Sequence, residues 1–387
     1  MAEITVIGGG IAGLTAAISC AGRGVCTTVY ESHSTLGGRA RSTSAPYIAN
    51  DGTHTFYCNG EPWQWLVKWG LVPSFSRLSA REAMGMRFRR EGKLRMTVPI
   101  GYLKMIARGR RLVPPVDRSF RDWGVENFGD QAVKDSVGFL GPVLYDANPG
   151  RLSASFVFER LLRVGTPRFP LPTRYVTGGW AGAVDQMARR ARELGVKIET
   201  GSRMTELPRH GPVIVATSLD AARALLDDGT LRWESGTSTL LDLAMTPSKR
   251  DRCDVFDMDD GGFIGHYSDH DASLAPEGES LFQGEMPMRR GESKADCLAR
   301  LEGLYDLAAP DWRGRVTWRR DYVSRGRTGA LDLPGTTWRD RPAIDRGGDV
   351  FLAGDSVAAP GILAEVSLNS GRAAADLAVE RLTTLHA

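Results

Sequence analysis

The beginning of the chain constrains the fold more than any other stretch. A short apolar run at 4–7 leads straight into a turn at 8–13 that reads G-x-G-x-x-G, and a helical pattern over 11–23 follows at once. An apolar run of this length, ended by glycines, is typical of a buried parallel strand. A glycine turn between a strand and a helix is the fingerprint of a dinucleotide-binding βαβ unit. The chain is therefore expected to fold around a parallel sheet.

Each glycine of this turn has a separate purpose. Gly8 permits the sharp turn, Gly10 lets the backbone approach a diphosphate, and Gly13 lets the helix pack closely on the strand. The first helical residues, Ile11 and Ala12, place their amide groups at the positive end of the helix, where an anion binds best. These five residues form the predicted diphosphate site.

A second apolar run, 26–30, ends on an acid, Glu31. Glu31 follows Gly13 at the spacing expected of the acid that binds both ribose hydroxyls of an adenosine. A carboxylate in this place disfavours a 2′-phosphate, because the two negative charges repel each other. The sequence therefore predicts a dinucleotide without that phosphate.

The residues after Glu31 favour FAD over NAD. Gly37, Gly38 and Arg39 complete the pattern E-x5-G-G-R. A second glycine turn gives room to the flavin side of the cofactor, and Arg39 offers a fixed fork of donors to a phosphate or a nearby carbonyl. This pattern resembles the extended fingerprint of the FAD-binding superfamily of flavin amine oxidases, phytoene desaturases and protoporphyrinogen oxidases. The resemblance implies non-covalent FAD, since no Cys or His lies in the family's attachment context.

The C-terminal part resembles the same superfamily. A buried strand is predicted at 349–355 and ends in Gly354 and Asp355, and in the superfamily this Asp accepts a hydrogen bond from a ribityl hydroxyl. The helix that follows, predicted to begin near Ile362, would aim its positive end at the pyrimidine side of the flavin. Glu365 lies near this helix end and is a candidate catalytic residue.

Two further segments are assigned by the resemblance. The stretch 51–56 resembles the acid-Gly-x-His-x-Phe segment that passes the isoalloxazine ring in desaturases and related oxidases. It would place His54 beside the substrate, where it could polarise or deprotonate the bond being oxidised; the alternative is a hydrogen-bonded structural histidine. The resemblance also takes 203–207, with Met204, past the adenine.

The chain is long enough for two compact units, with 387 residues and 42% hydrophobic content. The expected fold class is α/β: a Rossmann-like FAD-binding domain of the glutathione-reductase type, with a parallel sheet and helices, plus an α+β substrate domain with an antiparallel sheet. The FAD-binding domain is predicted to be discontinuous and to comprise 1–80, 176–235 and 330–387, and the substrate domain to comprise 81–175 and 236–329.

Composition excludes several other classes. A net charge of +3, with no basic stripe interleaved with aromatic residues, does not indicate a nucleic-acid partner. Five scattered cysteines, odd in number and without a C-x-x-C pair, indicate neither a disulfide framework nor a metal site. No apolar run approaches the roughly 18 residues of a membrane span. Only Met1, Ala2 and Glu3 precede the first strand, so no secretory segment is expected and a reduced cytoplasm fits best.

The stretch 93–111 mixes apolar and basic residues and has two interpretations. It could be a basic amphipathic face that docks on anionic lipid to collect an apolar substrate, which would make the protein membrane-associated. It could equally be a solvated helix face.

The resemblance implies an FAD-dependent oxidoreductase, a dehydrogenase, desaturase or oxidase. It would move a hydride from a largely apolar small molecule, such as a terpenoid or another secondary metabolite, to flavin N5. Three alternatives stay open: a flavin amine oxidase, a non-redox FAD-dependent isomerase or cyclase, and a non-catalytic FAD-binding protein. Because the chain has one dinucleotide fingerprint, electrons are expected to leave to oxygen, a quinone or a carrier rather than to NADPH. The oligomeric state is left open.

Overall fold

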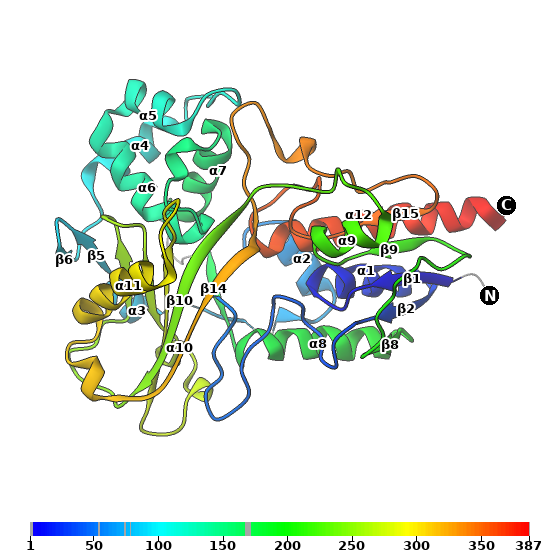
Figure 1. The fold of residues 1–387 in the computed structure, drawn as a ribbon, viewed down its shortest axis with the longest axis horizontal. Coiled ribbons are helices and arrows are strands. Elements are labelled where there is room, and N and C mark those ends of the chain that lie inside the picture. The colour runs from blue at the N-terminus through cyan, green and yellow to red at the C-terminus, as the bar shows by residue number, and fades with distance from the viewer. Residues whose placement is uncertain (1–2, 53–54, 73–74, 78, 167–171, 387) are drawn as a thin grey trace.

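The computed structural model describes residues 3–52, 55–72, 75–77, 79–166 and 172–386. Two sheets dominate it, and they lie at opposite ends of an elongated molecule (Figure 1). The N- and C-terminal ends of the chain lie together at one of these ends.

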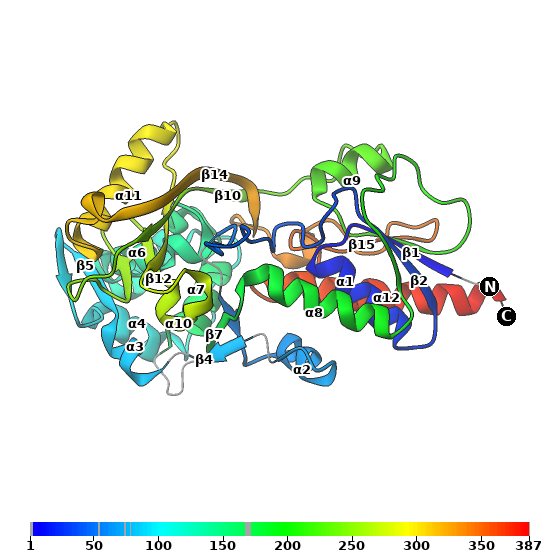
Figure 2. The same ribbon diagram turned by 90° about the horizontal axis from the view of Figure 1, so that it is seen from below.

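A five-stranded parallel sheet forms around the first strand. Its order is β15-β9-β1-β2-β8, and every neighbouring pair is parallel. Helices α1, α8 and α12 lie on one side of this sheet and α9 on the other (Figure 2), which is why its central strands are short apolar runs buried on both faces. The strands are β1 (Glu3–Ile7), β2 (Cys26–Tyr30), β8 (Lys197–Glu199), β9 (Val213–Val215) and β15 (Val350–Leu352); the helices are α1 (Ile11–Ala21), α8 (Gly179–Glu193), α9 (Leu219–Leu226) and α12 (Ala364–His386).

A seven-stranded sheet forms the other end, in the order β14-β10-β13-β12-β11-β5-β6. All its neighbours are antiparallel except β5 and β11, which run parallel. The long strands β10 and β14 reach toward the parallel sheet and connect the two ends (Figure 1). The strands are β5 (Arg87–Arg90), β6 (Lys93–Arg95), β10 (Ser235–Met245), β11 (Asp254–Asp257), β12 (Phe263–His266), β13 (Ser280–Pro287) and β14 (Val316–Ala330).

Helices pack on this sheet through two separate apolar clusters. The helix α11 (Lys294–Ala308) contributes Leu301 and Tyr305 to one cluster, where they meet Leu241 of β10. The other cluster joins Phe88 of β5 to a group of four helices. These four are α4 (Ile100–Gly109), α5 (Phe120–Phe128), α6 (Asp130–Leu144) and α7 (Ala154–Gly165).

A small third sheet lies between the two ends, in the order β3-β7-β4. Its strands are β3 (Phe56–Tyr57), β4 (Phe75–Arg77) and β7 (Thr173–Val176), and the remaining helices are α2 (Glu61–Lys68), α3 (Ala80–Gly85) and α10 (Tyr267–His270). Short 3-10 turns occupy Pro149–Arg151, Ala272–Leu274, Trp312–Gly314 and Trp338–Asp340.

The predicted fold class is confirmed, with two differences in detail. The sheet predicted as antiparallel contains one parallel pair, because β5 comes from a separate part of the chain and joins β11 at its edge. The helix predicted from Ile362 begins at Ala364, since Leu363 is left-handed with φ of 51°. The domain boundaries stay a prediction. No described helix is long and apolar enough to cross a membrane.

Candidate functional site

The glycine turn lies where predicted, at the carboxyl end of β1. Gly8 donates its N–H to the Tyr30 carbonyl at 2.8 Å, which joins the turn to β2. An ideal Cβ on Gly13 would lie 1.9 Å from the Gly8 carbonyl oxygen. Gly13 is therefore required by the packing of α1 on its own turn, as the sequence predicts.

Gly10 has no such steric reason to be glycine. Its backbone is extended, with φ of −80° and ψ of −177°, and its Cβ would meet nothing nearer than the Gly37 carbonyl oxygen at 3.7 Å. Gly10 is also the N-cap of α1 and no side chain caps this helix, so the first amides, Ile11 and Ala12, remain available. The turn therefore offers open space in front of free N–H groups, which fits a bound diphosphate.

Glu31 is buried beside this turn. Its Oε2 accepts the Gly9 N–H at 2.8 Å and its Oε1 accepts the His33 N–H at 2.8 Å. Ser202 donates its N–H to the Glu31 carbonyl at 2.8 Å and so brings the segment after β8 alongside. Oε1 also accepts the Ser32 hydroxyl at 3.2 Å, whereas Oε2 keeps a second lone pair for a ribose hydroxyl.

Met204 follows shortly after, half-buried against an apolar cluster that contains Ile7 and Val213. This placement is close to the turn, and its contact with adenine stays a prediction.

The second glycine turn packs directly on the first. Gly37 donates its N–H to the Gly9 carbonyl at 2.9 Å, and both Gly37 and Gly38 have positive φ, 114° and 60°. This backbone conformation is one that other residues rarely adopt. The two turns together form a cradle made mainly of backbone.

Arg39 and Asp355 meet although 316 positions separate them. The guanidinium and the carboxylate form a bidentate pair, with Nη2 and Oδ1 2.6 Å apart. The Asp355 side chain is 14% exposed and that of Arg39 is 31% exposed. The two predicted cofactor residues from opposite ends of the chain therefore belong to one site; their contacts with a phosphate and a ribityl hydroxyl stay predictions.

Ser370, which was not among the predicted site residues, fixes the backbone next to Asp355. Its fully buried hydroxyl accepts the Gly354 N–H at 2.9 Å and donates to the Gly354 carbonyl at 2.9 Å. The neighbouring Gly371 allows α12 to approach α1, since a Cβ there would lie 2.5 Å from the Ala12 carbonyl oxygen. The small residues Ser370 and Gly371 in the middle of a predicted helix could have indicated this close approach.

Glu365 is 2% exposed and both its carboxylate oxygens are engaged. Oε1 pairs with the Arg163 guanidinium, and Oε2 accepts the Ile362 N–H at 3.1 Å. Burial raises the pKa of Glu365, and Arg163 opposes this shift. Glu365 thus anchors the turn before α12; its predicted catalytic role stays untested.

A second arginine of α7 holds the same turn. Arg160 lies over the Phe156 ring, 3.4 Å from its centroid, and donates to the Gly361 carbonyl at 3.3 Å. Burial lowers its pKa to about 10. The turn before α12 is therefore fixed by two cations that come from the other half of the molecule.

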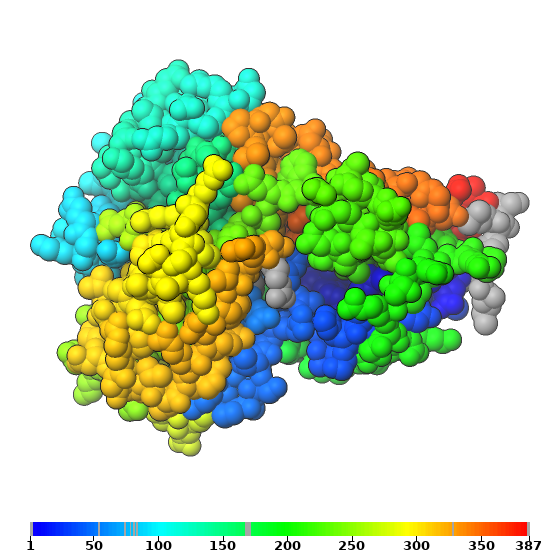
Figure 3. Space-filling view, viewed as in Figure 1, coloured from blue at the N-terminus to red at the C-terminus, as the bar shows by residue number. Residues whose placement is uncertain are grey.

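A small cavity lies beside this turn. Its lining combines Asp355, Ile362 and Leu363 with apolar residues of α6 and β14 and with Arg160 of α7. The stretch after β14, orange in the space-filling view, covers the junction between the two halves near this place (Figure 3). The cavity lining is Val143, Leu144, Arg160, Gly329, Ala330, Leu331, Arg341, Asp355, Ile362, Leu363 and Val366.

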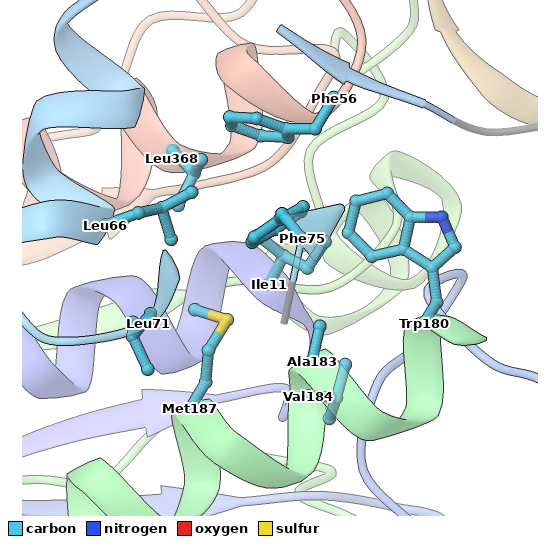
Figure 4. Close-up of a pocket in the computed structure, with 10 residues that line it drawn as sticks. All are labelled: Ile11, Phe56, Leu66, Leu71, Phe75, Trp180, Ala183, Val184, Met187 and Leu368. Carbon is cyan, nitrogen blue, oxygen red and sulfur yellow. The ribbon is translucent and has the colours of Figure 1, made fainter. Parts of the chain in front are cut away.

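A second small cavity is lined, among the described residues, only by hydrophobic side chains. It lies between α1, α2 and α8, with Ile11, Leu66 and Met187 around it (Figure 4). Its lining contains no titratable group, so it offers no acid or base.

His54 lies outside the described residues, so its predicted place beside the flavin stays a prediction. Nearby, Asp51 Oδ1 pairs with Arg320 Nη1 at 3.0 Å and Phe56 begins β3. All five cysteines are free.

Comparison with known proteins supports the nucleotide-binding assignment. A family model described as an NAD(P)-binding Rossmann-like domain matches residues 6–68, which include both glycine turns and Glu31. No curated protein sequence matches the chain.

Solved structures match over nearly the whole chain. An oxidoreductase from Methanosarcina mazei is 17% identical, with a TM-score of 0.76, covering 97% of this chain and 100% of its own. Cyclohexylamine oxidase from Brevibacterium oxydans is 16% identical, with a TM-score of 0.72, covering 99% of both chains. Reduced UDP-galactopyranose mutase is 14% identical, with a TM-score of 0.67, covering 98% of this chain and 96% of its own. The chain therefore has the fold of an amine oxidase-like oxidoreductase, and the resemblance predicted from its sequence is confirmed at the level of the fold.

Proposed function

We propose that this protein is an FAD-dependent oxidoreductase that takes a hydride from a carbon of a largely apolar small molecule. The observation that carries this proposal is the meeting of Arg39 with Asp355 beside the two glycine turns. An NAD-binding domain has no need for a second glycine turn or for a Gly-Asp from the C-terminal strand, whereas the longer FAD needs both.

The residues of the cradle would hold the cofactor without a covalent link. The amides at the start of α1 would bind the diphosphate, Glu31 the ribose, and Asp355 the ribityl chain. When bound, the flavin supplies the redox chemistry by accepting a hydride. The chain's own contribution is to orient both partners and exclude water, and the turn held by Glu365 and Arg160 is suited to this.

The cavity next to Asp355 is the proposed substrate site. Val143, Leu144 and Leu331 supply apolar surface. Two buried arginines also line the cavity: Arg341, which pairs with Asp332, and Arg160. Such a lining favours an apolar skeleton with at most one polar or anionic group, such as a terpenoid or another secondary metabolite. An arginine in the lining argues against a cationic amine, which makes amine oxidation the second choice.

Anaerobic mixing with candidate substrates tests the proposal. Bleaching of the flavin absorbance supports a redox enzyme, whereas product without bleaching supports an isomerase or cyclase, a choice kept open by the similarity to UDP-galactopyranose mutase. Acid precipitation should release FAD into the supernatant. Colour left in the pellet, or FMN in the supernatant, contradicts the cofactor assignment.

Electrons would leave to oxygen, a quinone or a protein carrier. The printed family name mentions NAD(P), but the matched stretch 6–68 is one dinucleotide unit, and FAD would occupy it. Rapid flavin reduction by NADPH without substrate would contradict this part of the proposal.

We also propose that α4 and the strand before it contact anionic membrane surfaces. One face of α4 is buried through Tyr102 and Met105, while Ile100 on the other face is 70% exposed beside basic residues. The preceding Met96 is also 70% exposed. Flotation with vesicles of phosphatidylcholine and phosphatidylserine should carry the protein upward at low salt, and the double variant Met96→Ser, Ile100→Ser should stay behind. Equal flotation of both proteins would refute the contact.

A further inference from the structure

Three side chains that metals commonly use meet where β11 begins and α10 ends. One potential ligand atom each from Cys253, Asp254 and His270 lies within 4.8 Å of the other two. The side chains of Asp254 and His270 are 1% and 2% exposed. This cluster lies in the half of the molecule built on the seven-stranded sheet and includes none of the predicted cofactor residues.

Two polar atoms of this cluster have no hydrogen-bond partner among the described residues. These are Oδ1 of Asp254 and Nε2 of His270, which are 3.7 Å apart, too far for a hydrogen bond. A buried polar atom without a partner is costly, and native structures rarely leave two of them facing each other.

In both His270 and Asp254, the polar atom that faces away from the cluster has a hydrogen-bond partner outside it. Oε1 of Glu82 lies 2.8 Å from Nδ1 of His270, and the Tyr175 hydroxyl donates to Oδ2 of Asp254 at 3.1 Å. The Tyr175 ring also stacks on the His270 ring, with centroids 3.7 Å apart. A carboxylate on the distal nitrogen of a histidine is the usual support of a metal-binding histidine, because it fixes the tautomer that leaves the other nitrogen free.

We propose that Sγ of Cys253, Oδ1 of Asp254 and Nε2 of His270 bind a zinc ion, with water as the fourth ligand. A thiolate and a carboxylate balance the charge of the dication, and a sulfur, nitrogen and oxygen set suits zinc better than the oxygen-preferring magnesium or calcium. Binding releases the thiol proton to solvent.

The site would tie α10 to the start of β11, next to a segment that is distant in sequence. Next to His270, the Asp271 carboxylate accepts the Gly178 N–H at 2.6 Å, at the turn that opens α8. Tyr175, which supports Asp254, is in β7. Zinc would therefore hold α10 against the start of β11, and these hydrogen bonds connect that pair to the strand and turn that lead into the parallel-sheet half.

The test uses the tag-free, FAD-loaded protein. It is stripped with a chelator, dialysed against zinc and analysed for bound metal. We expect one zinc ion per chain in the parent and in the control variant Cys26→Ala, which removes an exposed cysteine outside the cluster. We expect loss of this zinc in Cys253→Ala and His270→Gln. Glu82→Gln should weaken zinc binding by about 10- to 100-fold, the usual effect of removing an outer partner.

A parent that binds no zinc, or ligand variants that keep it, would overturn the proposal. If the ligand variants do not fold, X-ray absorption of the zinc-loaded parent decides. One sulfur at about 2.3 Å with nitrogen and oxygen at about 2.0–2.2 Å supports the site, and a shell without sulfur overturns it.

Discussion

Replacing Gly10 and Gly13 separately by alanine tests whether the cradle is built for a ligand. At Gly13 the added Cβ would lie 1.9 Å from the Gly8 carbonyl oxygen, so something must shift in the folded protein itself. Overpacking of this kind costs about 1–3 kcal/mol or more, which exceeds the roughly 1 kcal/mol that alanine gains over glycine in a helix. Gly13→Ala should therefore destabilise the protein with or without FAD.

Gly10→Ala should behave in the opposite way. Its Cβ meets no protein atom nearer than 3.7 Å, so the FAD-free protein should stay within about 1 kcal/mol of the parent, the cost of alanine at an N-cap. With FAD bound, the methyl group occupies the space of the diphosphate. The same steric cost of about 1–3 kcal/mol then appears in binding and weakens it by about 5- to 150-fold.

Denaturant unfolding of the FAD-free proteins and fluorescence titration with FAD separate the two effects. Gly10→Ala should bind FAD more weakly and keep the parent's denaturant midpoint. Gly13→Ala should unfold at a lower denaturant concentration than the parent. Unchanged FAD affinity in Gly10→Ala would refute the assignment of the cradle. An equally large loss of stability in both variants would show that Gly10 serves packing alone.

The remaining predictions concern single side chains. Glu31→Gln should weaken FAD binding by about 1.5–3 kcal/mol for each charge-assisted hydrogen bond lost, and equal FAD retention would count against its ribose contact. Burial raises the pKa of Asp242 to about 6 against the opposing Arg320, so the native state binds this proton more tightly than the unfolded state does. The stabilisation from protonated Asp242 is therefore present at low pH and is lost as pH rises through about 6, which lowers the free energy of unfolding by about 2–3 kcal/mol. Urea unfolding of Asp242→Asn between pH 4 and 7 should no longer show this decrease. Glu365→Gln should keep FAD and change flavin reduction by substrate in anaerobic stopped flow far less than the 10²–10⁴-fold expected of a general base; a loss of that size would restore its catalytic role.

The parallel sheet was predictable because its signals are local. The turn at 8–13, the acid at Glu31 and the glycines at 37–38 each occupy one strand-to-helix or strand-to-loop junction, and their backbone conformations depend on neighbours close in sequence. The resemblance then connected this start of the chain to Gly354 and Asp355. It did not predict that Arg39 and Asp355 pair with each other. That contact depends on the distance between the second glycine turn and the end of β15 in the folded protein, which the sequence alone does not give.

The contacts that fix the turn before α12 were not predictable from spacing. Arg160 and Arg163 are separated from Gly361 and Glu365 by about two hundred positions, and nothing in their own segment marks them as more than the polar face of a helix. The Cys253 cluster was missed for a related reason. His270 follows Asp254 by 16 positions, outside the short spacings that indicate a metal site, and they meet only because β12 returns the chain beside β11.

The surroundings of Glu365 indicate what the protein itself contributes to the proposed reaction. A general base must reach the substrate, but Glu365 is 2% exposed and is not among the residues that line the cavity. One of its oxygens pairs with Arg163 and the other accepts the Ile362 N–H, so its carboxylate is directed at the protein. Proton transfer to this carboxylate would neutralise it and leave the Arg163 guanidinium without its negatively charged partner, which is costly. The geometry therefore favours positioning: Glu365 and Arg160 hold the turn of Ile362 against the cavity, so that a bound flavin and an apolar substrate would meet in a fixed arrangement. Such orientation alone can supply a large part of the barrier reduction, because the entropy of bringing two reactants together is lost on binding rather than in the chemical step.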